Sequence, residues 1–381
     1  MGYLKRLRGE NMMKITGITL HYVQMKLKNA FTNSFGTVRD RSFIIIEANT
    51  EDGMTGWGEC VAFDQPWYTE ETIQTCSHIL KDILIPAIIG QHINHPDELV
   101  SFFAPVRRNP MAKSAIEGAI WDLYAKKKGL SLANVLGGKR KQIEAGISIG
   151  LKKNDEELFA AIDNSLAQGY KRIKLKIKPG LDISLISKVR RRYPRIPIMA
   201  DANSAYTLAD MDTLRELDQY GLMMIEQPLA YNDLYEHALL QKELKTKICL
   251  DESIQSAHDA LQAIRLGSCR VINLKIGRVG GLSKSLKILK LCEEEGIDVW
   301  CGGMLETGIS RAHTIALASM NAVNLPGDIS STKNYWNRDI TAQEVVVLNG
   351  CIDTPDKPGI GFEINRDALE AFTVRKEHFH A

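Results

Sequence analysis

The chain has 381 residues, of which 44% are apolar and 25% charged, with 48 Lys and Arg against 46 Asp and Glu. This length favours two domains over one, and the composition is ordinary for a globular protein. A net charge of +2 gives no indication that nucleic acid or an anionic membrane surface is a partner.

The first dozen residues and the cysteines bear on the location of the protein. Residues 1–12 hold Lys5, Arg6 and Arg8, but no apolar stretch of signal-peptide length follows, so we expect an N-terminal extension and no export. The seven cysteines are scattered, odd in number and without a C-x-x-C pair, which favours free thiols in a reducing cytoplasm. No apolar run reaches the roughly 18 residues of a membrane span. We therefore expect a cytoplasmic protein.

Residues 13–141 show strand patterns followed by helix patterns, without regular alternation. Such an order indicates an α+β domain. Alternating apolar residues predict the strands, an Asp-Gly pair with further glycines predicts a hairpin turn, and capping residues mark the helix starts. The expected elements are strands at 15–25 and 42–49, a turn within 51–59, a helix starting at 69–72 and an amphipathic helix over 112–127.

From residue 142 onward, short apolar runs alternate with helix-like segments, which is the pattern of βα units around a parallel sheet. One charged residue recurs in or just after successive runs, at intervals of 24 or 25 residues. In a closed barrel of such units the carboxyl ends of the strands meet at one face, so these side chains should converge there. The recurring residues are Lys176, Asp201, Glu226, Asp251 and Lys275, and the expected strands include 142–150, 172–177, 299–303 and 324–329.

Three carboxylates at one point would repel one another by roughly several kcal/mol in a low dielectric, unless a cation lies between them. Their oxygen ligands, with no His or Cys, favour Mg²⁺, and Mn²⁺ or another divalent cation could substitute. Taken singly, Asp201 could begin a turn, Glu226 could pair with an arginine and Asp251 could cap a helix. Lys174 and Lys176, two apart on a strand, point to the same side, although a basic run at 171–178 is also compatible with a solvated strand end. The joint spacing favours the metal site.

The ordered motifs resemble those of the enolase superfamily, in its muconate-lactonizing-enzyme-like branch, and are most similar to the o-succinylbenzoate synthase and N-acylamino acid racemase group. The resemblance extends over nearly the whole chain from about Lys14. Five motifs in one order are far more specific than any one of them alone. They are Lys174-Leu175-Lys176, Asp201-Ala202-Asn203, Glu226-Gln227-Pro228, Asp251-Glu252-Ser253 and Lys275-Ile276-Gly277.

The resemblance implies a (β/α)7β barrel, a modified TIM barrel, with an α+β capping domain that closes its mouth. We expect the capping domain at 13–141, the barrel at 142–343 and a C-terminal return to the capping domain at 344–381. Lys176 and Lys275 would be the acid and base catalysts, and Asp201, Glu226 and Asp251 the metal ligands. We expect a small carboxylate as substrate, a homo-oligomer as the assembly, and neither nucleic acid nor a membrane as partner. Residues expected to bind substrate or support the site are Lys174, Asn203, Glu252, Ser148, Arg278, Gly303, Met304, Phe31 and Phe35.

Several of these supporting residues have a specific expected role. Asn203 and Glu252 would orient the metal ligands. Arg278 would help to keep Lys275 partly neutral through its positive charge. The resemblance makes two capping-domain loops the specificity elements, namely 29–36 with Phe31 and Phe35 and 61–68 with Phe63 and Trp67. These aromatics could instead simply pack the domain.

The expected chemistry is abstraction of a proton next to a carboxylate, through an enediolate that a divalent cation stabilises. If a second lysine returns a proton from the opposite side, the centre inverts and the enzyme is a racemase. If a leaving group sits on the next carbon, an alkene forms, as in the dehydration that the resemblance implies for menaquinone biosynthesis. Dipeptide epimerases resemble this scaffold but carry Asp-x-Asp after the eighth strand, where this chain has Asp328 and Ser330. A muconate-type cycloisomerase is a further alternative, and a non-enzymatic metal-binding scaffold is the weakest.

Overall fold

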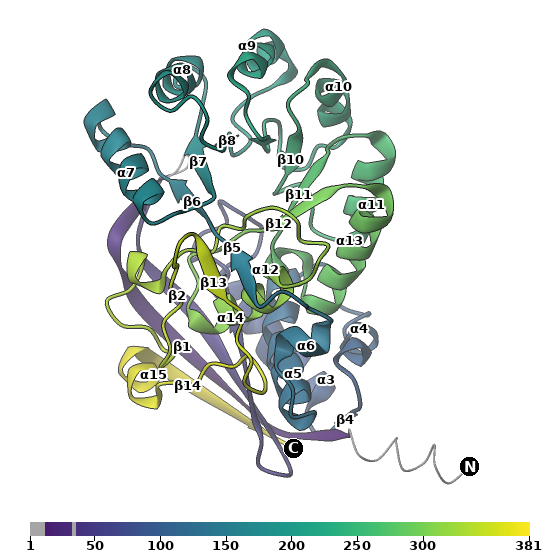
Figure 1. Cartoon of the computed structure of the whole chain (residues 1–381). Coiled ribbons are helices and arrows are strands. Elements are labelled where there is room, and N and C mark those ends of the chain that lie inside the picture. The colour runs from purple at the N-terminus through teal and green to yellow at the C-terminus, as the bar shows by residue number, and fades with distance from the viewer. Residues whose placement is uncertain (1–11, 33–35) are drawn as a thin grey trace.

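A computed structural model describes residues 12–32 and 36–381, and these form two large sheets, a small two-stranded sheet and their helices (Figure 1). The first sheet is antiparallel, with the order β14-β1-β2-β3 and β4 paired to β1. The predicted strands at 15–25 and 42–49 are confirmed and are longer than expected, and the Asp52-Gly53 turn follows β2. The bounds are β1 Met13–Thr32, β2 Thr37–Thr50, β3 Thr55–Cys60, β4 His92–Ile93 and β14 Thr373–His380.

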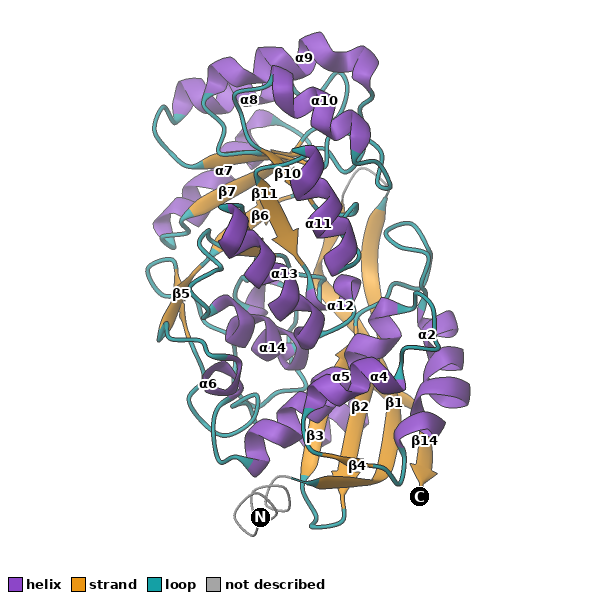
Figure 2. Cartoon of the chain, turned by 90° about the vertical axis from the view of Figure 1, so that its right-hand side faces the viewer, coloured by secondary structure: helices purple, strands orange, loops and turns teal. Residues whose placement is uncertain are grey.

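Two helices of this first part, α2 and α5, pack directly on that sheet, and others pack against α5 (Figure 2). The predicted start at 69–72 is confirmed, because Thr72 caps α2 by accepting a hydrogen bond from Thr75 N at 3.2 Å. The helices are α2 Ile73–Ile79, the π-helix η1 Leu80–Leu84, α3 Ile85–Ile88, the 3₁₀ helix η2 Pro96–Glu98, α4 Leu99–Phe102, α5 Pro110–Lys127 and α6 Leu132–Leu136.

Helix α5 was expected to be amphipathic, and that prediction is wrong. The helix is buried from Pro110 to Leu123, because β2 and β3 cover one side and helices of the barrel cover another. Gly58 of β3 allows this close approach, since a Cβ there would overlap the carbonyl oxygen of Ala115 on α5. Helix α5 therefore joins the two halves of the fold and presents no solvent face over most of its length.

The second sheet is parallel, has seven strands in the order β12-β11-β10-β9-β8-β7-β6, and carries helices on its outer side (Figures 1 and 2). Its strands are β6 Gly146–Ile149, β7 Arg172–Lys176, β8 Ile198–Asp201, β9 Ile225–Glu226, β10 Ile248–Leu250, β11 Val271–Leu274 and β12 Asp298–Cys301. Its helices are α7 Asp155–Ala167, α8 Ile183–Arg192, η3 Leu208–Asp210, α9 Met211–Glu216, η4 Leu217–Tyr220, α10 Tyr235–Glu243, α11 Ala257–Leu266, α12 Ile276–Val279, α13 Leu282–Glu295 and α14 Gly308–Ala318.

The predicted strand at 324–329 is not a regular strand. Pro326 has no N–H to give to a ladder, and this segment makes only an isolated bridge, between Gly327 and Ala145. It still closes the barrel, because Gly146 N donates to Gly327 O at 2.7 Å and Asp328 N donates to Cys301 O at 2.9 Å. The predicted first strand at 142–150 is also divided, since β5 Gln142–Glu144 leaves the barrel sheet to pair with β13.

The C-terminal segment returns to the first sheet. After η5 Thr332–Asn334, β13 Cys351–Asp353 pairs with β5, and α15 Arg366–Phe372 leads into β14 beside β1. The segment 29–36 was expected to be a loop, but β1 extends to Thr32 and pairs with β2 there. Phe35 lies outside the described residues, as does the side chain of Phe31.

The barrel interior is layered beneath its charged residues. Met199, Met224 and Cys249 each lie two residues before a predicted metal ligand, hence on the same side of their strands. They form a buried apolar cluster with Val271 and Trp300. This apolar cluster lies directly beneath the polar residues at the strand ends. Within the described ranges, no helix is long and apolar enough to cross a membrane.

Candidate active site

The three predicted metal ligands lie at the carboxyl ends of adjacent strands. Asp201 ends β8, Glu226 ends β9 and Asp251 directly follows β10. Parallel pairing sets Asp201 beside Glu226, and Glu226 beside Cys249, and all three carboxylate residues are only 1% exposed. The strand register therefore brings together side chains that are 50 residues apart in sequence, from 201 to 251.

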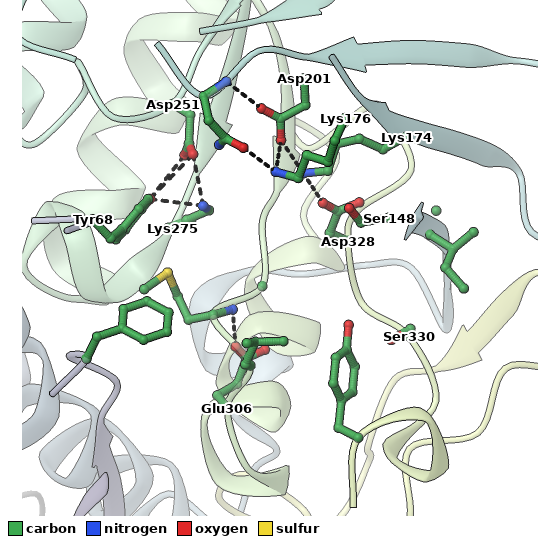
Figure 3. Close-up of a pocket in the computed structure, with 18 of the residues that line it drawn as sticks. Tyr68, Ser148, Lys174, Lys176, Asp201, Asp251, Lys275, Glu306, Asp328 and Ser330 are labelled. Atoms are coloured by element: carbon green, nitrogen blue, oxygen red, sulfur yellow. Dashed lines mark hydrogen bonds and ion pairs between the residues drawn. The ribbon is translucent and has the colours of Figure 1, made fainter. Parts of the chain in front are cut away.

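Three lysines point at these carboxylates (Figure 3). Lys174 Nζ lies 3.3 Å from Asp201 Oδ2 and 3.2 Å from Glu226 Oε2, and it also pairs with Asp328. Lys176 Nζ donates to Asp201 Oδ2 at 2.6 Å and to Asn203 Oδ1 at 2.7 Å. On the other side, Lys275 Nζ donates to Asp251 Oδ2 at 2.9 Å. Lys176 and Lys275 thus approach from β7 and from the end of β11, with the carboxylate-bearing strands between them.

Tyr68 completes the Lys275 side and was not singled out from the sequence, although it belongs to the 61–68 segment. Its hydroxyl accepts hydrogen bonds from Lys275 Nζ and from Arg278 Nη1, both at 2.9 Å, and donates to Asp251 Oδ1 at 3.3 Å. The Lys275 ammonium also lies 4.6 Å from the centre of the Tyr68 ring. The repeat spacing of the barrel could not identify Tyr68, because this residue belongs to the part of the chain that precedes the barrel.

The charge of Arg278 acts on Lys275 in the expected direction, but it does not make this lysine neutral in the arrangement shown. Burial and the charge of Arg278 do lower the pKa of Lys275, but the adjacent Asp251 raises it further, to a value above the usual range. Arg278 itself forms an ion pair with Asp251 and donates from Nε to Ile254 O at 2.7 Å. Its guanidinium pairs with Oδ1 of Asp251 while Lys275 pairs with Oδ2, so the two cations together fix that carboxylate in place.

The carboxylates interact strongly with one another. Burial and the charge of Asp201 raise the pKa of Glu226 to about 7, and burial and the charge of Asp251 raise the pKa of Glu252 to about 8. Although burial opposes it, Lys275 and Arg278 hold the pKa of Asp251 below its usual range, and Lys176 and Lys174 do the same for Asp201. Glu226 and Glu252 are therefore the carboxyl groups of this cluster that hold a proton most readily.

Asn203 and Glu252 contact the site as expected. Asn203 N donates to Asp201 Oδ1 at 3.1 Å, and its side-chain amide donates to Glu252 Oε1 at 3.3 Å. The other oxygen, Glu252 Oε2, is buried and has no hydrogen-bond partner among the described residues. Asn203 therefore links Asp201, Lys176 and Glu252.

The donor set fits a divalent cation in its chemistry. In the arrangement shown, no group of three His, Cys, Asp or Glu side chains within the described residues lies close enough to share an ion, because lysines occupy the carboxylate oxygens. The donors are nevertheless three buried carboxylates from adjacent strand ends. The raised pKa of Glu226 records their mutual repulsion, which a hard cation would relieve. Asp201, Glu226 and Asp251 are thus suited to hold Mg²⁺.

A pocket with a cavity volume of about 90 Å³ opens over these groups. The predicted Ser148, Gly303 and Met304 line it, and Phe63 and Trp67 do so while packing together at 4.3 Å between ring centres. Of the predicted residues with described side chains, Glu226, Glu252 and Arg278 lie behind its wall. The sequence reasoning did not single out several further lining residues, which are Tyr68, Leu305, Glu306, Arg311, Ser330 and Tyr335.

Comparison with known proteins agrees with this geometry. Residues 15–137 match the N-terminal domain of mandelate racemase and muconate lactonizing enzyme, and residues 157–368 match the enolase C-terminal domain-like family. The chain belongs to the enolase superfamily. The predicted family and fold class, a barrel with an α+β capping domain, are thereby confirmed. Enzymes of this superfamily depend on a divalent metal ion, typically Mg²⁺.

Individual relatives of this superfamily member carry two kinds of name. An o-succinylbenzoate synthase of Geobacillus kaustophilus is 52% identical over 368 residues, which cover 97% of this chain and 98% of that protein. An N-succinylamino acid racemase of Thermus thermophilus is 41% identical over 369 residues, covering 97% and 100%. The crystal structure of an enolase superfamily member from Listeria innocua has a TM-score of 0.94 and 43% identity, and the match covers 97% of this chain and 99% of that one.

Proposed function

We propose that this enzyme removes the proton α to the carboxylate of a small substrate, acting as an o-succinylbenzoate synthase and as a racemase of N-succinylamino acids. The observation that carries the proposal is the placement of Lys176 and Lys275 on opposite sides of one carboxylate cluster. Two bases on opposite faces are what inversion of a carbon centre requires. Relatives named for each of the two activities support the pair of reactions.

The proton to be removed is only weakly acidic, because its loss places a second negative charge on the carboxylate group. A divalent cation held by Asp201, Glu226 and Asp251 would supply positive charge beside the substrate carboxylate. Lys176 or Lys275 takes the proton, and only a neutral lysine can do so. In the arrangement shown both are paired with Asp201 or Asp251, so each must leave its carboxylate before it can act as base.

The fate of the enediolate depends on the substrate. In racemisation Lys176 takes the proton of one enantiomer, and Lys275 returns a proton to the opposite face. For the dehydration, Lys176 is the base and Lys275 serves mainly as a cation beside the enediolate. Tyr68 accepts hydrogen bonds from Lys275 and from Arg278, so it holds Lys275 in place without involving the substrate.

The contacts of Asp328 support an acylated amine over a free amine in the substrate. A free ammonium group needs an unpaired carboxylate, but Asp328 pairs with both Arg172 and Lys174 and is held ionised by them. The position two residues later is Ser330. A dipeptide substrate would therefore lack a counterion for its amino group here.

The deciding experiment is a substrate panel in D₂O with Mg²⁺, followed by NMR for exchange of the α-proton. The panel holds N-succinylamino acids, dipeptides and the precursor of o-succinylbenzoate. We expect exchange or turnover with the succinylated compounds and the precursor, and none with dipeptides. Exchange confined to dipeptides would refute the proposal.

Three further parts of the proposal concern the cofactor, the assembly and the location. We propose Mg²⁺ as the bound cation, a homo-oligomer as the assembly and the cytoplasm as the compartment, and all three stay predictions. Titration calorimetry with Mg²⁺, sedimentation of the purified chain and fractionation of cells would test them.

A further inference from the structure

Glu59 connects the first sheet to the active-site wall of the barrel. It lies near the end of β3, is 7% exposed, and its carboxylate accepts three hydrogen bonds from the start of α14. Oε1 accepts from Thr307 N at 3.0 Å, and Oε2 accepts from Thr307 Oγ1 at 2.7 Å and Ser310 N at 3.0 Å. A buried carboxylate with these contacts satisfies donors at the helix start that would otherwise be unpaired.

The segment held in this way is the one that lines the pocket. Thr307 is the N-cap of α14, and Gly303 to Glu306, directly before it, form part of the pocket wall. Leu305 has φ +57°, in the left-handed region that costs a non-glycine residue energy, so its conformation must be imposed by its surroundings. The Glu306 carboxylate accepts from Met304 N, and Glu306 O accepts from Trp336 Nε1 at 3.2 Å.

The same segment begins against Lys275. A Cβ at Gly302 would lie 2.6 Å from Lys275 Cε and would also overlap the side chain of Asn273. The backbone at residue 302 therefore limits the positions open to the aliphatic chain of Lys275. The hydrogen-bond partners of Lys176, Asp201 and Asn203, lie outside that segment.

We propose that Glu59 is a positioning residue that, through Thr307 and the 302–306 segment, sets the position of Lys275 and leaves Lys176 unaffected. This inference rests on the proposed function, because it uses the two-lysine exchange as its readout. Its consequence is an asymmetry that a merely structural role would not produce. Damage to the Glu59 contacts should impair the proton transfer of one face only.

The test is Glu59→Gln, which keeps the size of the side chain but replaces one acceptor oxygen with an amide donor facing Thr307 or Ser310. Exchange of the α-proton is followed in D₂O by NMR for each enantiomer of an N-succinylamino acid. A Lys275→Ala variant first identifies which enantiomer exchanges through Lys275. We expect Glu59→Gln to slow that exchange by about tenfold relative to the other, the effect of losing one or two buried hydrogen bonds.

Asp122→Asn is the matched control. Asp122 is also a buried carboxylate that serves β3, accepting from Trp57 N at 2.9 Å and Ile360 N at 2.8 Å, but it does not line the pocket. The ratio of the two exchange rates should be unchanged in this variant. Glu59→Asp, which keeps the charge, should recover part of the lost exchange.

If Glu59→Gln does not fold, the pair Thr307→Val and Thr307→Ser examines the same contact from the barrel side. Only Thr307→Val removes the hydroxyl donor, so only this variant should shift the ratio. Equal slowing of both enantiomers, or no slowing, would overturn the positioning role. A wild-type enzyme that exchanges neither enantiomer would overturn the proposed function, and with it this inference.

Discussion

Replacing Lys275 by alanine should abolish racemisation. It should leave a weak but measurable exchange of the α-proton on the Lys275 face. A proton acceptor left in place is the hydroxyl of Tyr68, which lies 2.9 Å from Lys275 Nζ. Burial raises the pKa of Tyr68 to about 12, so at pH 8 only about one molecule in 10⁴ carries the phenolate. Loss of Lys275 also removes a positive charge that lowers the pKa of Tyr68, so exchange on that face should fall by several powers of ten.

The assay is α-proton exchange of each enantiomer of an N-succinylamino acid in D₂O, from pH 7 to pH 10. We expect Lys275→Ala to exchange the S enantiomer through Lys176, while the residual exchange of the R enantiomer rises about tenfold per pH unit. Lys176→Ala should exchange only the R enantiomer, because Lys174 beside it is held protonated by Asp328, Glu226 and Asp201. Adding Tyr68→Phe to Lys275→Ala should abolish the remaining pH-dependent exchange of the R enantiomer.

Lys275→Arg separates the two roles assigned to this lysine. An arginine keeps the positive charge but is not a base near neutral pH. The variant should lose racemisation and keep more of the dehydration than Lys275→Ala does. If both single alanine variants exchanged both enantiomers at the wild-type rate, the two-base assignment would be wrong and another residue would be the base.

Four other predictions concern the metal, the acyl group, stability and the shared pocket. Each of the variants Asp201→Asn, Glu226→Gln and Asp251→Asn removes one carboxylate and should weaken Mg²⁺ binding measured by calorimetry. The circular dichroism spectrum should be unchanged. An inactive variant that binds Mg²⁺ with wild-type affinity would refute the ligand assignment. Deleting residues 29–36 should change relative kcat/KM across acyl groups more than the exchange rate, and an unchanged ranking would count against a specificity role. Against the effect of burial, hydrogen bonds from His21 and Arg366 lower the pKa of Glu47 to about 2, so its stabilising contribution is present above about pH 4.5 and lost as the pH falls toward 2. Urea unfolding of Glu47→Gln should show a loss of about 2 kcal/mol at pH 7 that shrinks at pH 3; a constant difference would contradict this. Finally, o-succinylbenzoate should inhibit racemisation competitively, and a noncompetitive pattern would place the two activities in different sites.

The barrel could be predicted from the sequence because its pattern of apolar and charged residues repeats at a regular interval. Each βα unit repeats one apolar strand and one charged strand end, so Lys176, Asp201, Glu226, Asp251 and Lys275 stand out together. The closing segment 324–329 was harder to predict, because Gly327 and Asp328 close the barrel through single backbone hydrogen bonds where a ladder was expected. Periodicity indicates that a unit is present, but it does not show how the last unit meets the first.

Site residues that come from outside the repeated βα units could not be predicted in this way. Tyr68 and Glu59 belong to the part of the chain that precedes the barrel, and nothing in their spacing connects them with Lys275 or Thr307. The misjudged solvent face of α5 has the same cause, because burial depends on what covers a helix from distant parts of the chain. The charge state of Lys275 likewise depends on the distance to Asp251, which the sequence does not contain.

One set of catalytic residues can serve both the racemisation and the dehydration, because the two reactions share their first step and differ only after it. Proton removal needs a base on one face and positive charge beside the carboxylate, and this step is common to both substrates. After it, a leaving group on the neighbouring carbon departs if one is present; if none is present, Lys275 can reprotonate the opposite face. The strand-end residues need not change between the two outcomes, so relatives with different names can share them. The pocket wall, which Phe63, Met304 and Leu305 form from two separate parts of the chain, affects how well each substrate is held. A contact such as Glu59 to Thr307, which fixes one of these parts against the other, is therefore where the balance between the two reactions can be adjusted without touching a base.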